Sequence, residues 1–357
     1  MKRLALFALL IAAPLAAQRD TTPARGGRGA GRGGGGGWNG AMDSSRIRQL
    51  YVSKDPADLR GCGTNCERDM AGKRRTDSVY TAKAPGNYEF QKIKYKSRAD
   101  GLEIPAYVFS PIKKSATKHA ALVWVHGGVH GDWNTGLYPF VVEAVKRGYV
   151  ILAPDYRGST GYGRAYRERL YGEWGIVDVE DCVRAVEHVA AEGRADGNRA
   201  LITGSSAGGY TVLCALVGYD RFRAGASHYG IGDLALLVSD THKFESRYTQ
   251  RLIGDDPEIW RERSPIHHVG RIDCPVLFLQ GLEDRVVPPE QSQHMVAALR
   301  ARGVPVAYLE FAGESHGFRR AETLRRALEA ELDFHTRVLR LAPAEPLVPV
   351  VIEPPLP

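Results

Sequence analysis

One serine of this chain lies in a setting that would make it a nucleophile. Ser206 is the third residue of Gly-Ser-Ser-Ala-Gly at 204–208, which follows an apolar run at 200–203 and precedes a helix-compatible stretch at 209–216. A sharp turn from a strand into a helix lifts one side chain clear of the sheet, and it needs small flanking residues. The pattern predicts that Ser206, rather than its neighbour Ser205, presents a hydroxyl for attack on a carbonyl carbon.

A serine attacks a carbonyl when a base removes its proton and an acid orients that base. Asp284 follows the apolar stretch 276–279, and His316 lies in a glycine-flanked loop after the stretch 306–311. Serine, then acid, then histidine is the chain order of α/β-hydrolases, in which each residue follows a strand. We therefore predict a catalytic triad of Ser206, Asp284 and His316.

Two of these assignments have competitors nearby. Glu283 is adjacent to Asp284, and the spacing to Val-Val-Pro at 286–288 favours Asp284. Only His316 follows the last predicted strand in a glycine-bracketed loop. The competing histidines include His126, His228, His267 and His268.

The oxyanion that forms in acyl transfer needs preorganised hydrogen-bond donors. The backbone N–H of Ala207, directly after the nucleophile, is predicted to supply one. His-Gly-Gly at 126–128 follows an apolar stretch, and the N–H of Gly127 or Gly128 is predicted to supply the other. A glycine pair after a strand is otherwise a plain turn. His126 itself is expected to be structural rather than a catalytic base.

The elements that must position these residues alternate between strands and helices. Strands are predicted at 88–95, 102–109, 120–125, 149–153, 200–203, 224–228, 276–279 and 306–311. Helices are predicted at 138–147, 177–192, 209–216, 289–302 and 321–339. This alternation implies a mostly parallel sheet of about eight strands with helices on both faces. The segment 232–271 has no clear strand character and either roofs the site or packs as ordinary short helices.

Both ends of the chain are expected to lie outside this domain. A basic start, a short apolar run and two alanines at 16–17 are typical of a secretory signal peptide, and a retained membrane anchor is the alternative. Cleavage predicts a secreted or periplasmic protein without stable membrane association. The expected divisions are a signal peptide at 1–17, a Gly/Arg-rich disordered linker at 18–40, an N-terminal extension at 41–87, the catalytic domain at 88–340 and a Pro-rich tail at 341–357.

The positive charge of the chain is concentrated at its start. Six Lys and Arg residues against Asp20 give the first forty residues a net charge of +5, which leaves +2 of the overall +7 for the remainder. The basicity therefore belongs to the leader and linker, and it predicts no nucleic-acid partner.

The five cysteines are expected to be structural. In an oxidising compartment Cys62 and Cys66 could close a local disulfide, whereas a zinc site would need two more ligands. Cys182, Cys214 and Cys274 lie among apolar neighbours, where a free cysteine usually acts as a small buried hydrophobe. The predicted chemistry needs no metal and no organic cofactor.

From about residue 88 to 339 the chain resembles the catalytic domain of the prolyl oligopeptidase family of serine peptidases. The resemblance rests on a combination of motifs: His-Gly-Gly at 126–128, Asp-Tyr-Arg-Gly-Ser-Thr-Gly-Tyr-Gly at 155–163, Gly-Glu-Trp-Gly at 172–175 followed by Asp178 and Asp181, the stretch 204–210, Ser-Pro-Ile at 264–266, the stretch 281–288 and His-Gly-Phe at 316–318. The block at 155–163 is the most diagnostic, and the resemblance implies that it braces the loops below the site. The family commonly has proline at Val129 and glycine at Ser205, and many members carry a β-propeller for which the region before residue 88 is too short.

The resemblance implies a serine hydrolase that cleaves peptide bonds through an acyl-enzyme. The same apparatus would hydrolyse esters, so a carboxylesterase with an ester substrate is the alternative on this fold. A non-catalytic binding protein on a hydrolase scaffold is the alternative of another class.

Overall fold

The structure is a computed structural model that describes residues 81–84, 88–112, 117–133, 139–240, 246–342 and 345–357. The predicted signal peptide and linker lie outside these residues, as do most of the N-terminal extension and Cys62 and Cys66. In the part of the chain that the structure describes, no helix is long and apolar enough to cross a membrane.

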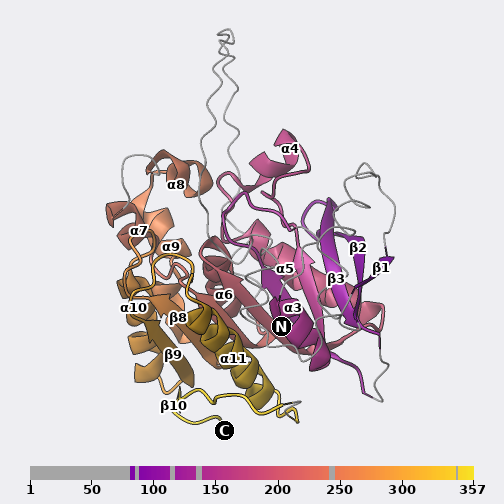
Figure 1. The fold of residues 1–357 in the computed structure, drawn as a ribbon. Helices are drawn as coiled ribbons and strands as arrows, with labels where there is room; N and C mark the ends of the chain where they lie inside the picture. The colour runs from indigo at the N-terminus through magenta and orange to yellow at the C-terminus, as the bar shows by residue number, and fades with distance from the viewer. Residues whose placement is uncertain (1–80, 85–87, 113–116, 134–138, 241–245, 343–344) are drawn as a thin grey trace. The chain divides into compact units, whose positions relative to one another are not determined.

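A single sheet of ten strands runs through the described residues (Figure 1), in the order β1-β2-β3-β5-β4-β6-β7-β8-β9-β10. The strands are β1 (Thr81–Ala84), β2 (Tyr88–Lys96), β3 (Glu103–Pro111), β4 (Ala120–Val125), β5 (Tyr149–Pro154), β6 (Asp196–Ser205), β7 (Phe222–His228), β8 (Val276–Gly281), β9 (Val306–Phe311) and β10 (Ile352–Glu353). The strands from β5 to β9 in this order pair in parallel, and β1, β2, β3 and β10 pair antiparallel at the two edges. The predicted mostly parallel sheet is confirmed, with two more strands than expected.

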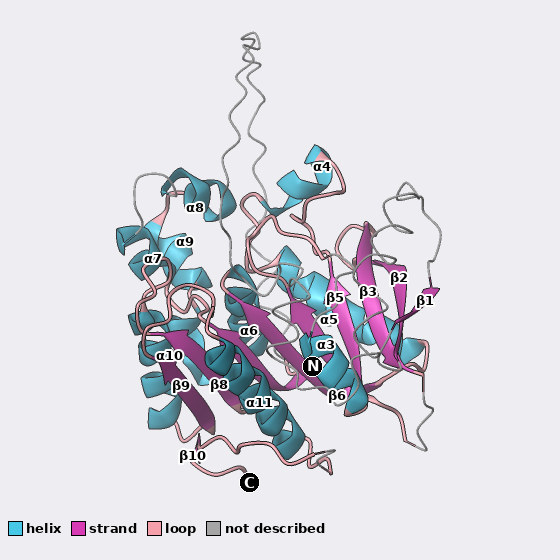
Figure 2. Ribbon diagram, viewed as in Figure 1, coloured by secondary structure: helices cyan, strands magenta, loops and turns pink. Residues whose placement is uncertain are grey.

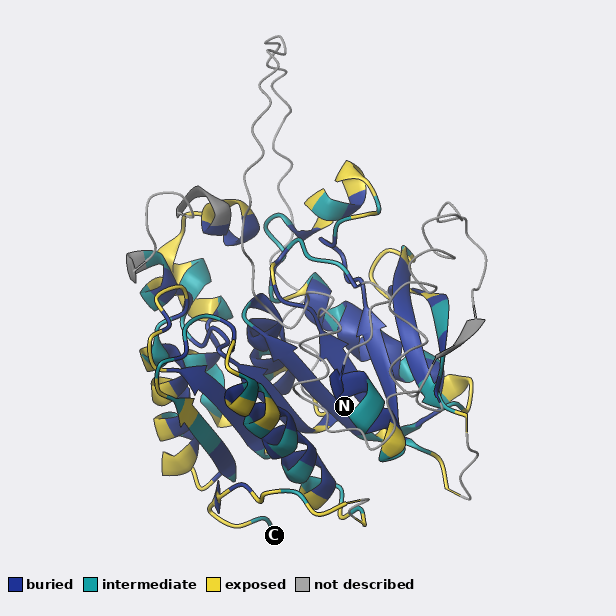
Figure 3. Cartoon of the chain, viewed as in Figure 1, coloured by how far each residue is buried: buried dark blue, intermediate teal, exposed yellow. Residues whose placement is uncertain are grey.

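Helices cover both faces of the sheet (Figure 2). They are α3 (Pro139–Lys146), α4 (Arg164–Arg167), η1 (Glu168–Leu170), α5 (Val177–Ala191), α6 (Ala207–Gly218), α7 (Leu234–Asp240), α8 (Ser246–Ile253), α9 (Pro257–Arg263), η2 (Pro265–Arg271), α10 (Pro289–Ala301) and α11 (Ala321–Val338). The core has two parts: α5, α6 and α10 pack on one face, and α3 and α11 pack on the other. Because successive strand residues point to opposite faces, Val123 of β4 joins the first cluster and Leu122 the second. The whole of β4 is buried for this reason, and most of the sheet is dark blue in Figure 3.

The two strands that the sequence did not indicate are short and lie at the sheet edges. β1 precedes the expected domain boundary at residue 88, and β10 lies in the tail that was expected to stay outside the core. Val350 and Ile352 of that tail are buried against the α11 face. Asp333 of α11 accepts a hydrogen bond from the Val350 N–H at 2.8 Å, so the tail is held as a strand along β9.

The segment 232–271 folds mainly into short helices, α7, α8, α9 and η2. It is tied to the Gly-Glu-Trp-Gly loop at 172–175, because the guanidinium of Arg263 donates to the carbonyl of Gly172 at 2.7 Å and the N–H of Gly172 donates to the carbonyl of Arg251 at 3.1 Å.

The Asp-Tyr-Arg-Gly-Ser block is anchored to α5 through a buried guanidinium. Arg157 donates from Nη2 to Asp181 Oδ1 at 2.8 Å, and its backbone N–H donates to Asp181 Oδ2 at 2.8 Å. The same guanidinium reaches Glu180. Since the Asp181 side chain has no exposed surface, the carboxylate depends on Arg157 for its charge balance.

Arg157→Ala is expected to lower the free energy of unfolding by about 3–5 kcal/mol, because it leaves the buried carboxylate of Asp181 without its charge partner. Urea titration followed by circular dichroism measures this loss. The control is Arg169→Ala, since Arg169 is exposed and pairs with Asp100 at 3.4 Å, and an exposed pair contributes about 0–1 kcal/mol. Equal losses in the two variants would contradict the assigned role of Arg157.

Candidate active site

Ser206 occupies a strained turn between β6 and α6, as the sequence predicts. β6 ends at Ser205 and α6 begins at Ala207, and Ser206 has φ 55° and ψ −120°. Such backbone strain in a residue with a side chain costs about 1–3 kcal/mol and persists only where the surroundings enforce it. A Cβ on Gly204 would lie 2.6 Å from the carbonyl of Gly208, so glycine is required at the start of the turn.

The three predicted catalytic side chains meet in one hydrogen-bonded row. His316 Nε2 lies 2.9 Å from Ser206 Oγ, and His316 Nδ1 lies 2.8 Å from Asp284 Oδ2. This geometry fixes the neutral tautomer: Asp284 accepts the proton of Nδ1, so Nε2 is left to receive the proton of Ser206. The residues come together because β6, β8 and β9 run in parallel, and the loops after them leave the same edge of the sheet.

The structure distinguishes the two adjacent acids. The side chain of Asp284 is fully buried, and its Oδ1 accepts the N–H groups of Val286 and Val287 at 2.9 Å each. Its other oxygen is thereby directed at the imidazole of His316. Glu283 is exposed. Asp284 is therefore the acid that is placed to orient the histidine.

The glycine pair lies next to the start of the elbow helix. A Cβ on Gly208 would lie 2.6 Å from the carbonyl oxygen of Val125 and 2.7 Å from that of His126, so the first turn of α6 packs directly on the end of β4. Gly128, with φ +64°, begins the following loop. Ala207 is the first residue of α6, and the first N–H groups of a helix have no acceptor within the helix. The predicted donors on Gly127, Gly128 and Ala207 are thus brought into one neighbourhood.

The side chain of His126 joins the glycine loop to the block at 155–163. Its ring stacks on Tyr156 at 4.2 Å, and its Nε2 lies 2.8 Å from Ser159 Oγ. Ser159 Oγ also lies 2.8 Å from the carbonyl oxygen of Tyr156, and His126 Nδ1 lies 3.3 Å from the carbonyl oxygen of Gly127. Burial lowers the pKa of His126 to about 4, which keeps the ring neutral. These contacts fit the structural role expected for it.

Two residues near the site were not singled out by the sequence. Asp155 is fully buried, its carboxylate accepts the N–H of Trp133 at 2.7 Å and the hydroxyl of Tyr162, and burial raises its pKa to about 7. It therefore holds the far end of the glycine loop. Tyr229, with φ 38°, sets its ring edge-on to His316 at 5.0 Å between centroids. The motif at 155–163 signalled the first, and no local pattern marks the second.

A second buried histidine predicts acid sensitivity. Burial lowers the pKa of His335 to about 4, whereas an unfolded histidine has a pKa near 6.5. The unfolded chain therefore binds this proton first, and stability falls as the pH drops from about 6.5 to about 4, by at most ~3 kcal/mol for one such group. In the His335→Phe variant, the part of the fall in stability at low pH that comes from this histidine should be absent.

The measurement is the difference in unfolding free energy between pH 7 and pH 4.5, from urea titrations. The control is His294→Phe on the exposed side of α10, which should keep the full acid loss. An acid loss that stays unchanged in His335→Phe would count against the buried neutral histidine.

Comparisons with known proteins agree with this geometry. The model of the prolyl oligopeptidase family matches residues 137–342, which is more than half of the chain. The acylamino-acid-releasing enzyme of Arabidopsis thaliana is 32% identical over 241 residues, which make up 63% of this chain and 31% of that enzyme. A solved puromycin-hydrolyzing peptidase of Mycobacterium tuberculosis is 43% identical with a TM-score of 0.70, covering 73% of this chain and 41% of that one. A solved puromycin hydrolase is 40% identical with a TM-score of 0.72, covering 79% of this chain and 45% of that one.

This chain spans about a third of the length of the Arabidopsis enzyme and less than half of each solved chain. The structural similarity confirms the predicted α/β-hydrolase fold. The expected lack of a β-propeller stays a prediction. Because the family model covers more than half of its residues, the chain belongs to the prolyl oligopeptidase family.

Proposed function

We propose that this protein is a serine peptidase that hydrolyses amide bonds through an acyl-enzyme. The observation that carries the proposal is the hydrogen-bonded row of Ser206, His316 and Asp284. The similarity to an acylamino-acid-releasing enzyme and to a puromycin-hydrolyzing peptidase supports amide bonds as the target.

The first half of the reaction acylates the serine. Ser206 Oγ bonds to the substrate carbonyl carbon while His316 Nε2 takes its proton, and Asp284 stabilises the imidazolium that results. The negative charge on the carbonyl oxygen is stabilised by the N–H of Ala207 and that of Gly127 or Gly128. When the C–N bond breaks, His316 gives its proton to the leaving amine, and the acyl group stays on Ser206.

In the second half of the reaction water is the nucleophile and Ser206 is the leaving group. His316 takes a proton from water, the hydroxide oxygen bonds to the acyl carbon, and the C–O bond to Ser206 breaks as the serine recovers its proton. The acid product leaves with the acyl group.

The test combines turnover with labelling. Purified protein is given acetylated amino-acid and dipeptide p-nitroanilides, puromycin and p-nitrophenyl butyrate, and it is separately treated with a fluorophosphonate. Nitroaniline release or puromycin cleavage, together with an adduct on Ser206, is the expected result. Turnover of the ester alone would replace the peptidase by a carboxylesterase. No turnover and no adduct would favour a binding protein on this scaffold.

We also propose that the protein is exported, on the basis of the residue pattern at 1–17. Expression of the whole chain in a Gram-negative bacterium should yield a periplasmic or secreted product whose N-terminus begins near residue 18. A cytoplasmic product with an intact N-terminus would overturn this proposal, and a membrane-bound product with that N-terminus would favour the retained anchor.

A further inference from the structure

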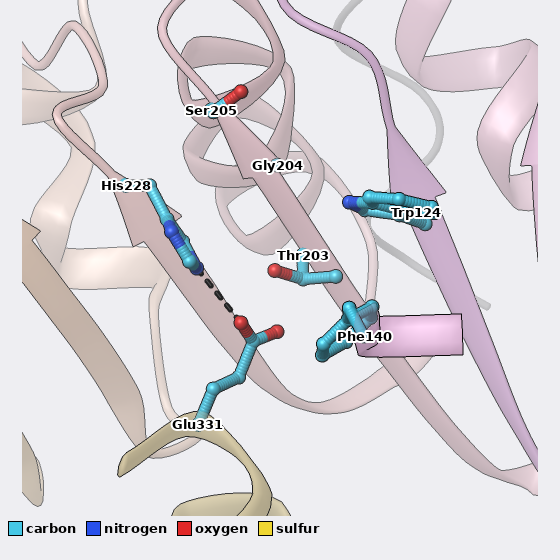
Figure 4. Close-up of a pocket in the computed structure, with 7 residues that line it drawn as sticks. All are labelled: Trp124, Phe140, Thr203, Gly204, Ser205, His228 and Glu331. Carbon is cyan, nitrogen blue, oxygen red and sulfur yellow. Dashed lines mark hydrogen bonds and ion pairs between the residues drawn. The ribbon is translucent and has the colours of Figure 1, made fainter. Parts of the chain in front are cut away.

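A buried pair of ionisable side chains lies beneath the nucleophile. His228 is the last residue of β7 and Glu331 lies on α11, and His228 Nε2 is 2.8 Å from Glu331 Oε2. Both side chains are almost completely buried. Figure 4 shows His228 and Glu331 pointing toward each other beside Thr203, Gly204 and Ser205 of β6. The pair therefore joins α11 to the end of the strand next to the elbow.

The backbone of His228 is part of the elbow. Its carbonyl oxygen accepts the N–H of Ser206 at 2.9 Å. The next N–H along the chain, that of Tyr229, donates to the carbonyl of Leu279 in β8 at 2.7 Å. The peptide group between His228 and Tyr229, at the end of β7, is thus hydrogen-bonded both to the turn that carries Ser206 and to β8.

The residue after His228 contacts the catalytic base. Tyr229 has φ 38°, a left-handed conformation that a tyrosine rarely adopts, and its ring packs edge-on against both His316 and Phe318. Ser206 has φ 55° on the other side of the shared hydrogen bond. Two strained residues therefore meet at the peptide group that follows His228, and strain of this kind needs a rigid surround.

The space around the pair makes its hydrogen bond important. A cavity of about 10 Å³ lies here, lined by Trp124, Phe140, Thr203, Gly204, Ser205, His228 and Glu331, and this is room for about one water molecule. Close packing alone does not fix the side chain of His228 on this side. Burial alone would raise the pKa of Glu331, but His228, His335 and Thr203 together lower it below its ordinary value, so the carboxylate is charged and holds His228 through a charge-assisted bond.

We propose that Glu331 and His228 are positioning residues for the reaction, which hold the peptide group after His228 so that Ser206 and His316 keep their attack geometry. The inference rests on the proposed function. Neither side chain touches substrate; the pair acts through the carbonyl that receives the Ser206 N–H and through the ring of Tyr229. A displacement of about 1 Å at a reacting group can lower a rate ~100-fold.

The experiment measures how fast a fluorophosphonate modifies Ser206, because this reports the serine and histidine without an assumed substrate. The maximal labelling rate and the half-saturating probe concentration are determined separately. Glu331→Ala is expected to lower the maximal rate ~10- to 100-fold with little change in half-saturation. Glu331→Gln should lower the maximal labelling rate less than Glu331→Ala does, because the amide oxygen of glutamine still accepts the hydrogen bond from His228 Nε2.

A double-mutant cycle separates positioning from general loss of stability. Glu331→Gln combined with His228→Gln should label no more slowly than the slower single variant, because two partners of one bond do not contribute independently. Asp333→Asn is the matched control: it changes another acid on α11, one that holds the tail through Val350, and it should label at the unaltered rate. Circular dichroism verifies that each variant is folded, and the isosteric Glu331→Gln serves if Glu331→Ala does not fold.

Each remaining outcome overturns the inference. Unaltered maximal rates in folded Glu331 variants, or additive losses in the double variant, would show that the pair does not position the site while leaving the proposed function intact. A wild-type protein that is not labelled at Ser206 would remove the proposed function, and this inference with it.

Discussion

Ser206→Ala is expected to lower kcat for amide hydrolysis roughly a millionfold, to the level left by binding and oxyanion stabilisation alone. The reason is that Ser206 Oγ, 2.9 Å from His316 Nε2, is the atom that would form the acyl bond. Alanine fits the turn without added volume, so the variant should fold. Steady-state kinetics and fluorophosphonate labelling both measure the loss.

Ser205→Ala is the matched control, since it makes the same change one residue earlier. Ser205 is buried and lines the small cavity beneath the elbow. Its variant should keep a kcat close to that of the unaltered protein. Loss of labelling in Ser205→Ala with retention in Ser206→Ala would reverse the assignment of the nucleophile.

Asp284→Asn is expected to lower kcat about 10⁴-fold with the fold preserved. Oδ1 accepts two backbone N–H groups, so the amide oxygen of asparagine should stay there and its NH₂ group should face His316. That NH₂ group donates to Nδ1, which forces the proton of the imidazole onto Nε2. A protonated Nε2 cannot accept the proton of Ser206, and the base is disabled.

Glu283→Gln supplies the comparison for the acid, because it makes the same carboxylate-to-amide change in the adjacent exposed residue. We expect its kcat to stay near the starting value. A loss in Glu283→Gln that matches that of Asp284→Asn would mean that the loop adopts another arrangement during the reaction.

Much of the site could be predicted because its signals are local. The glycines at 204 and 208 indicate the turn around Ser206, and the apolar stretches before Asp284 and His316 indicate strands. In a parallel sheet the loops after such strands leave one edge, so chain order and strand ends suffice to bring the three residues together.

The features that the sequence did not predict are short strands at the sheet edges and residues whose partners are distant in the sequence. β1 and β10 have four and two residues, too few to show a period, and pairing with β2 and β9 makes them strands. Asp155 and Tyr229 acquire their roles from residues of other segments, Trp133 and His316.

The sequence by itself determined the parallel sheet, the strand-to-helix turn at Ser206 and the loop that carries His316, because turn chemistry and hydrophobic pattern act over a few residues. The oxyanion donors stay a prediction. The sequence favoured Asp284 over Glu283, but only the tertiary structure supplied the burial and the two N–H groups that orient its carboxylate, since these depend on how the chain closes around it. The tertiary structure also brought Glu331 to His228 across 103 residues, a contact that forms when α11 packs on the sheet and that no local pattern encodes.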